Sequence, residues 1–110
     1  RTRRTADAMG VAWCGPDDPS PPGSILVNAT PVGREPRETA PFSEEEIESA
    51  VAVVDMVYGE KETPLVAHAR ELEIPVADGR EVLLHQGIAQ FAAFTQRVPP
   101  KETMRASLER

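Results

Sequence analysis

The fold class is set by residues 24–33, which read SILVNATPVG. The apolar run 25–27 contains no polar residue, and such a run predicts a strand buried on both faces of a parallel sheet. A second apolar run, 50–54, ends at Asp55, and shorter strands are expected at 11–14 and 75–76. Helical segments separate these runs. The alternation of strands and helices predicts an α/β layered fold with a parallel sheet and right-handed crossovers.

Two helices begin with recognisable capping signals. Ser43 and Glu46 have the spacing of a capping box, and Phe42 with Ile47 has that of a hydrophobic staple. Thr63-Pro64 reads as an N-cap followed by proline at the first helical position.

Three further helices are expected. One runs from Thr2 or Thr5 to Met9, where Gly10 ends it, and the last follows Pro100. The longest runs from Gly79 or Arg80 to about Phe94. It is apolar around most of its circumference, which predicts that it is mostly buried.

Composition excludes several classes of function. The chain has 110 residues and a net charge of −6, whereas general nucleic-acid binding requires a basic surface. No apolar run approaches the roughly 20 residues of a membrane span. The single Cys14 has no partner for an internal disulfide, so a reducing, cytoplasmic setting is expected. His68 and His85 lie far apart without a second ligand nearby, so no metal site is expected.

Polar residues follow the two clearest strands, at the edge where parallel sheets bind ligands. Asn28 and Thr30 come after one strand, and Asp55 and Tyr58 come after the other. One interpretation is that Asn28, Thr30 and the backbone as far as Gly33 line a cofactor cleft. The other is that Asn28 and Asp55 only start turns. Strand positions alone leave both open.

Gln86 shares a helical face with apolar residues, so its amide is expected to be buried and to need partners. Those partners are either neighbouring backbone or a polar ligand. Gly79, at the start of the same helix, is either a turn glycine or a place where a flat ring approaches the backbone. Arg1, Arg3 and Arg4 crowd a helix N-terminus against the helix dipole, which favours a bound phosphate over a merely solvated helix start.

Four segments, which follow one another along the chain in the family's order, resemble shikimate dehydrogenases. Residues 28–33 (NATPVG) resemble the family's N-A-T-P-x-G segment, and 55–58 with 63–65 resemble its D-x-x-Y with a downstream T-P-L. Residues 78–91 resemble D-G-x-x-M-L-x-x-Q-x-x-x-Q-F, and Arg1-Thr2 resembles the end of N-R-T-x-x-K/R.

The resemblance implies a Rossmann-like, doubly wound parallel sheet in the order 3-2-1-4-5-6, of which this chain supplies the C-terminal portion, strands 3 to 6 with their helices, plus a C-terminal helical segment. Residues 1–110 would be the C-terminal part of the NADP-binding domain. The glycine-rich loop and the N-terminal substrate domain would lie upstream. Without them the strand at 25–27 would expose an apolar edge, so the chain is expected to pack against the rest of a longer polypeptide.

The resemblance also implies the roles of individual residues. Arg1 and Thr2 would contact the 2′-phosphate of NADP, with Arg4 as a helper. The cofactor cleft and the nicotinamide would be lined by Asn28, Thr30, Met56 and the backbone of Gly79. Tyr58 and Gln86 would hydrogen-bond the substrate.

The implied activity is the reversible reduction of 3-dehydroshikimate to shikimate, a step of aromatic amino acid biosynthesis. The family's catalytic Lys and Asp come from the N-terminal domain, so no catalytic residue is expected in this chain. A homodimer and a fusion to a dehydroquinate dehydratase are compatible with the resemblance. Two alternatives remain: a quinate/shikimate dehydrogenase that uses NAD, and a non-catalytic nucleotide-binding or interaction module.

Overall fold

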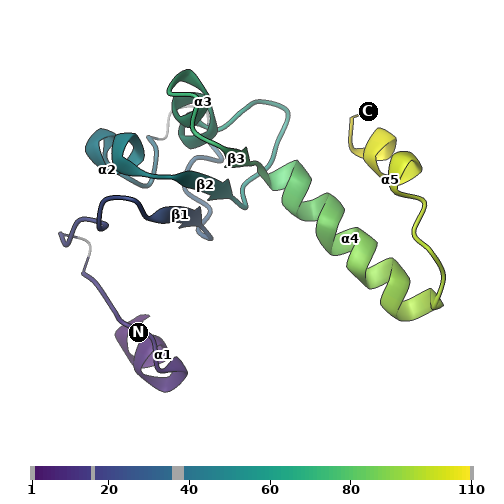
Figure 1. Ribbon diagram of the computed structural model, residues 1–110, viewed down its shortest axis with the longest axis horizontal. Helices are drawn as coiled ribbons and strands as arrows, with labels where there is room; N and C mark the ends of the chain where they lie inside the picture. The colour runs from purple at the N-terminus through teal and green to yellow at the C-terminus, as the bar shows by residue number, and fades with distance from the viewer. Residues whose placement is uncertain (1, 16, 36–38, 110) are drawn as a thin grey trace.

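The computed structural model describes residues 2–15, 17–35 and 39–109 (Figure 1). Three short strands alternate with helices, and two further helices follow the last strand. The elements are α1 (Thr2–Met9), β1 (Ile25–Asn28), α2 (Glu44–Ser49), β2 (Ala52–Asp55), α3 (Pro64–Glu71), β3 (Val76–Ala77), α4 (Gly79–Thr95) and α5 (Lys101–Leu108). The expected α/β alternation is therefore confirmed.

The strands form a parallel sheet in the order β1-β2-β3, with Asn28 level with Asp55. One face of the sheet carries the core. Leu26 and Val53 on neighbouring strands meet Ile47 of α2 and Leu65 of α3, and all four are at most 3% exposed. Both crossover helices thus cover the same face, and α4 begins at the carboxyl end of β3 (Figure 1).

The opposite face of β1 is uncovered. Burial alternates along this strand, and Ile25 and Val27 are 61% and 48% exposed. The prediction that 25–27 is buried on both faces is wrong for this chain, because α2 and α3 cover only one face. The expectation of an apolar edge is confirmed, since β1 is an edge strand.

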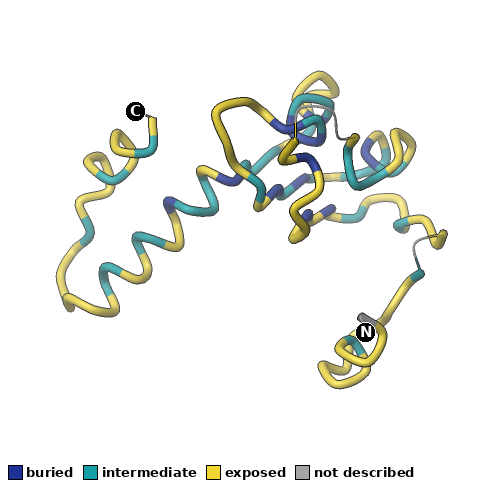
Figure 2. Tube along the Cα trace, turned by 180° about the vertical axis from the view of Figure 1, so that it is seen from behind, coloured by how far each residue is buried: buried dark blue, intermediate teal, exposed yellow. Residues whose placement is uncertain are grey.

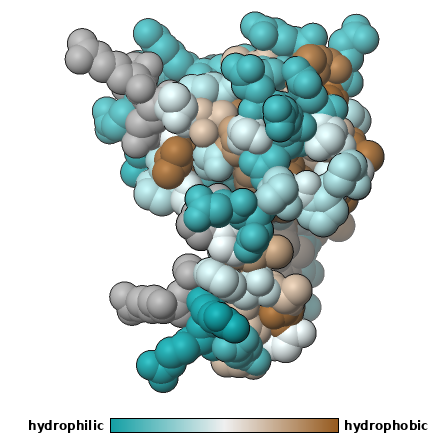
Figure 3. Space-filling model, turned by 90° about the vertical axis from the view of Figure 1, so that its left-hand side faces the viewer, coloured by the Kyte–Doolittle hydropathy of each residue, from teal (hydrophilic) through white to brown (hydrophobic). Residues whose placement is uncertain are grey.

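The strand expected at 11–14 is also wrong: within the described parts of the chain the sheet has three strands, and residues 11–14 form none of them. This segment lies beyond the amino end of β1, where no neighbouring strand offers hydrogen bonds. Trp13 instead stacks under the guanidinium of Arg3, 5.5 Å from the ring centre. In a side view, the molecule narrows between the lower part, which holds α1, and the upper part, which holds the sheet (Figure 3).

The long helix α4 is not the mostly buried element that its apolar residues predicted. Only Gly79 and Leu84 are buried in it, and Phe94 is 84% exposed. The helix leaves the sheet at its first turn, and its remaining length extends away from the core (Figures 1 and 2). Helix α5 folds back along α4, where Arg105 pairs with Glu81.

The predicted caps are confirmed. The Ser43 and Glu46 side chains cap each other's backbone reciprocally, and the Thr63 hydroxyl accepts a hydrogen bond from the Val66 amide of α3. The Glu46 carboxylate also accepts bonds from the amide and hydroxyl of Ser20, at 2.9 and 2.7 Å. It therefore ties the proline-rich loop before β1 to the start of α2.

Candidate functional site at the carboxyl edge of the sheet

A buried polar network joins the carboxyl ends of β1 and β2. The Asn28 amide donates to Oδ1 of Asp55 at 3.0 Å, and the Thr63 hydroxyl donates to Oδ2 of Asp55 at 2.6 Å. The three residues are 1%, 0% and 5% exposed. An unpartnered polar group at this depth costs about 1–3 kcal/mol, and within the described residues no buried side-chain polar atom lacks a partner. The network therefore fixes this edge of the sheet.

The same side chains shape the two loops that leave the strands. Oδ1 of Asn28 accepts from the amide and hydroxyl of Thr30 at 3.0 and 2.7 Å, and its Nδ2 donates to the carbonyl of Val32. Oδ1 of Asp55 accepts from the Val57 amide at 3.0 Å. Both residues therefore start turns, and that interpretation is confirmed. A cofactor cleft lined by Asn28 and Thr30 stays a prediction, in which the exposed Thr30 is the accessible member.

Two large side chains stand exposed beside this network. Met56 and Tyr58 are 47% and 49% exposed, whereas Val57 between them is half-buried. The amide of Met56 donates to the backbone carbonyl of Asn28 at 3.0 Å, which continues the β1–β2 pairing past the end of β2. The Met56 side chain and the Tyr58 phenol are thus exposed on a segment whose backbone is hydrogen-bonded to β1.

Gly79 lies against the backbone of this segment. A Cβ at Gly79 would come 2.4 Å from the carbonyl oxygen of Val57 and 2.8 Å from Cβ of Tyr58. The sequence leaves Gly79 as a turn glycine or as a place where a flat ring approaches the backbone, and the group that lies close to it in this structure is the backbone of Val57. Contact of Gly79 with a nicotinamide remains a prediction.

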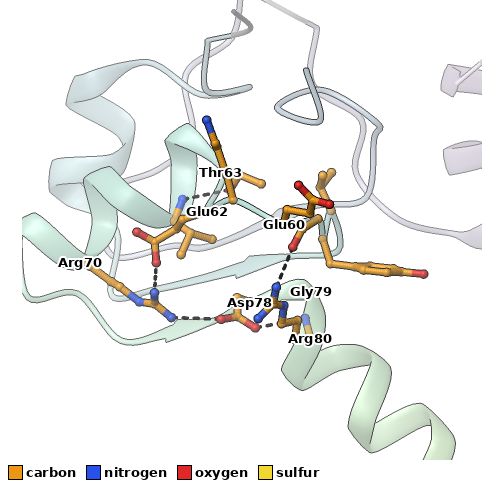
Figure 4. Close-up of a pocket in the computed structure, with 12 residues that line it drawn as sticks. Glu60, Glu62, Thr63, Arg70, Asp78, Gly79 and Arg80 are labelled. Atoms are coloured by element: carbon orange, nitrogen blue, oxygen red, sulfur yellow. Dashed lines mark hydrogen bonds and ion pairs between the residues drawn. The ribbon is translucent and has the colours of Figure 1, made fainter. Parts of the chain in front are cut away.

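Charged residues surround a pocket of about 140 Å³ between the loop 57–63 and the start of α4 (Figure 4). Arg70 of α3 pairs with Glu62 of the loop and, at 3.0 Å, with Asp78, the N-cap of α4. Arg80 donates from Nη2 to the carbonyl of Gly59 at 2.9 Å. The two arginines therefore link the loop that carries Tyr58 to α3 and α4.

The prediction of a buried Gln86 amide is wrong, because this side chain is exposed on the uncovered part of α4. Gln86 lines an open hollow between β3 and α4, together with Ala77 and Val82. Glu81 lies in the same hollow, and the hydrogen bond from Arg105 lowers the pKa of its carboxyl. Contact of Gln86 with a substrate remains a prediction.

Of the arginines expected at a phosphate, Arg4 is not brought to this edge. Arg1 and the side chain of Thr2 lie outside the described residues, and Arg4 is exposed on α1. Helix α1 lies apart from the sheet, on the side of its edge strand β1 and away from the start of α4 (Figures 1 and 2). The predicted grip on a 2′-phosphate therefore remains a prediction.

Sequence reasoning missed the residues that hold the site together. The sequence predicts Thr63 as a helix cap and as part of the T-P-L segment, and it gives no sign that the Thr63 hydroxyl also donates to Asp55. Arg70 and Arg80 gave no motif, and the one available signal was that Arg80 directly follows the Asp78-Gly79 helix start. In the described parts of the chain no His, Cys, Asp and Glu cluster could hold a metal ion, and no helix is long and apolar enough to cross a membrane.

Known proteins are similar to this chain in sequence and in fold. Residues 79–109 match the family model of the shikimate 5′-dehydrogenase C-terminal domain. The NADP(+) shikimate dehydrogenase of Nitrobacter hamburgensis is 35% identical over 105 residues, which cover 94% of this chain and 37% of the relative. That of Natronomonas pharaonis is 38% identical over 88 residues, covering 80% and 33%.

A solved structure agrees. Shikimate 5-dehydrogenase of Thermus thermophilus, in complex with NADP(H) and shikimate, superposes with a TM-score of 0.79 at 26% identity, over 97% of this chain and 41% of the other. The chain thus spans about a third of the length of the curated relatives that it matches. The predicted resemblance and the Rossmann-like fold are confirmed. Together the comparisons support the shikimate dehydrogenase family, with this chain similar to its C-terminal part.

Proposed function

We propose that this chain forms part of an NADP-dependent shikimate dehydrogenase, which reversibly reduces 3-dehydroshikimate to shikimate. The observation that carries the proposal is the carboxyl edge of the sheet, where exposed Thr30, Met56 and Tyr58 stand on the buried network of Asn28, Asp55 and Thr63. The relatives named above as NADP(+) shikimate dehydrogenases support the choice of reaction and of cofactor.

The edge offers chemistry that suits both ligands. NADPH, when bound, supplies the hydride. Met56 presents an apolar surface on which a flat nicotinamide ring can pack, and Thr30 adds a hydroxyl beside it. The Tyr58 phenol and the Gln86 amide are exposed hydrogen-bonding groups for a hydroxylated ring or its carboxylate. Their task is to orient the substrate, while proton transfer falls to groups outside this chain.

The proposal includes the rest of the polypeptide as a partner. β1 is an edge strand whose uncovered face shows Ile25 and Val27, and such an edge pairs readily with another strand. A parallel strand added there would complete the open edge of the sheet, and a further layer of the same polypeptide would cover Ile25 and Val27 on the open face.

The test is an assay of the whole polypeptide that carries these residues, with shikimate and NADP as substrates. Tyr58→Phe and Gln86→Ala each remove one hydrogen bond, and we expect the KM for shikimate to rise about tenfold while the KM for NADP changes little. Arg97→Ala, on the exposed segment after α4, is the matched control and should leave both constants unchanged.

Two results would overturn the proposal. Faster turnover of quinate with NAD than of shikimate with NADP would assign the protein to the NAD-dependent alternative. Binding of NADP without turnover of either substrate would assign it to the non-catalytic module.

A further inference from the structure

The loop 57–62 carries Tyr58 but has little of its own to hold it. Residues 59–62 are exposed and belong to no helix or strand. Tyr58 is followed by Gly59, the residue type with the greatest backbone freedom. A Cβ at Gly59 would meet no atom within 4 Å, so neighbouring packing does not restrain this position. The orientation of the Tyr58 ring must therefore be set by specific contacts.

The contacts fall on both sides of Tyr58. Before it, the Val57 amide donates to Asp55, and the Val57 carbonyl lies against Gly79. After it, the Gly59 carbonyl accepts a hydrogen bond of 2.9 Å from Nη2 of Arg80. Arg80 is itself held, because its amide donates to the N-cap Asp78 at 3.1 Å. Gly79 and Arg80, consecutive at the start of α4, thus contact the carbonyl of Val57, directly before the tyrosine, and the carbonyl of Gly59, one residue after it.

We propose that Arg80 is a positioning residue for Tyr58: its guanidinium holds the Gly59 carbonyl and so fixes the direction of the phenol at the carboxyl edge of the sheet. The consequence for substrate affinity rests on the proposed function, whereas the fixing of the ring does not. Arg70 restrains the far end of the same loop through Glu62, four residues beyond Tyr58. Its loss should affect the ring less than loss of Arg80.

Tyr58 is the single tyrosine of this chain, which gives the proposal a direct readout. In protein labelled with ring-¹³C tyrosine, its NMR signal can be assigned through Tyr58→Phe. In Arg80→Ala we expect this signal to move toward the chemical shift of an unfolded chain. We also expect the Tyr58 ring to exchange faster between orientations. Arg80→Lys keeps a donor and should restore part of the native signal, and Arg97→Ala should change nothing.

A second variant tests the same idea from the backbone. Gly59→Ala fits without a clash and reduces the freedom of the loop. Combined with Arg80→Ala it should return the Tyr58 signal toward its native position. Such a rescue would not follow if Arg80 acted only on the general stability of α4.

Kinetics of the whole polypeptide complete the test. Arg80→Ala should raise the KM for shikimate about fivefold to tenfold, with the KM for NADP unchanged and with partial recovery in the Arg80→Lys and Gly59→Ala backgrounds. An unchanged Tyr58 signal in folded Arg80→Ala would overturn the proposal. A shifted signal with an unchanged KM would overturn its consequence for substrate. Absence of shikimate turnover in the unaltered protein would overturn the proposed function alone, since the NMR result still decides the role of Arg80.

Discussion

Gly79 and Val57 lie so close that a β-carbon on the glycine would come 2.4 Å from the valine carbonyl oxygen. No side-chain rotation can relieve this contact, because both partners are backbone. Gly79→Ala should therefore push the 57–58 segment away from α4 and lower the free energy of unfolding by about 1–3 kcal/mol. Denaturant unfolding of the two proteins measures the difference.

Gly59→Ala is the matched control for that substitution. Its backbone lies outside the left-handed region and its β-carbon would meet no neighbour, so we expect stability to rise by about 0.4–1 kcal/mol. If both alanines had the same effect, the close approach at Gly79 would not be what selects glycine there.

The network between β1 and β2 predicts a strong response at Asn28. Asn28→Ala leaves an oxygen of buried Asp55 and the hydroxyl of Thr30 short of a partner, and it should lower the free energy of unfolding by about 2–4 kcal/mol. Thermal unfolding followed by circular dichroism measures the loss.

Asn28→Asp tests the electrostatics of the same pair. It sets two carboxylates against each other, so one of them acquires a pKa above its unfolded value. The variant should then regain stability as the pH falls through that raised pKa. A constant difference from the parent protein between neutral and mildly acidic pH would show that the two groups do not interact.

The hydrogen bonds that the Glu46 carboxylate accepts make the stability of the protein sensitive to acid. Hydrogen bonds from Ser43 and Ser20 lower the pKa of its carboxyl from 4.5 to about 2. Because the folded pKa lies below the unfolded one, the stabilisation is complete above about pH 4.5 and is lost as the pH falls toward 2.

Glu46→Gln removes this dependence. We expect the variant to be less stable than the parent by about 1 kcal/mol at neutral pH, the size of a typical helix cap, and the two stabilities to converge near pH 2. Urea unfolding across this pH range is the measurement. Glu44→Gln, an exposed residue of the same helix turn, is the control, and an equal pH effect in it would refute the assignment to Glu46.

The pairing of Arg105 with Glu81 holds α5 on α4. The pair is exposed, so its contribution should be screened by salt. Arg105→Ala should speed hydrogen exchange of the α5 amides at low salt and do so less in high salt. The charge-swapped pair Glu81→Arg with Arg105→Glu should restore part of the protection. Equal exchange in all three proteins would mean that α5 is held by Met104 against Gly87 instead.

Local chemistry predicted a large part of this structure. The caps at Ser43 and Thr63, the alternation of elements and the polar ends of β1 and β2 all follow from neighbouring residues, and all are confirmed. Burial was harder to predict because it depends on what covers a segment. The apolar strand 25–27 and the apolar helix α4 look like core in sequence, yet each shows an open face in this chain.

The candidate site divides in the same way. Asn28, Asp55 and Gly79 were visible because strand ends and a helix start have sequence signals. The contacts of Arg70 and Arg80 were not, since each joins residues that are distant along the chain: Arg80 bonds the carbonyl of Gly59. A guanidinium that meets a backbone carbonyl across a loop leaves no pattern in the order of residues.

The uncovered helix pair has a mechanical consequence. The 17 residues of α4 extend about 25 Å from Gly79, so a tilt of about 10° at the first turn would move the far end by about 4 Å. Arg105 of α5 pairs with Glu81, which lies in this same first turn, so the pair does not restrain the far end of α4. The first turn also contains Gly79, which packs against the Val57 carbonyl, and Arg80, which donates to the Gly59 carbonyl. A partner that packs along α4 and tilts it would therefore also shift the contacts that orient the Tyr58 ring.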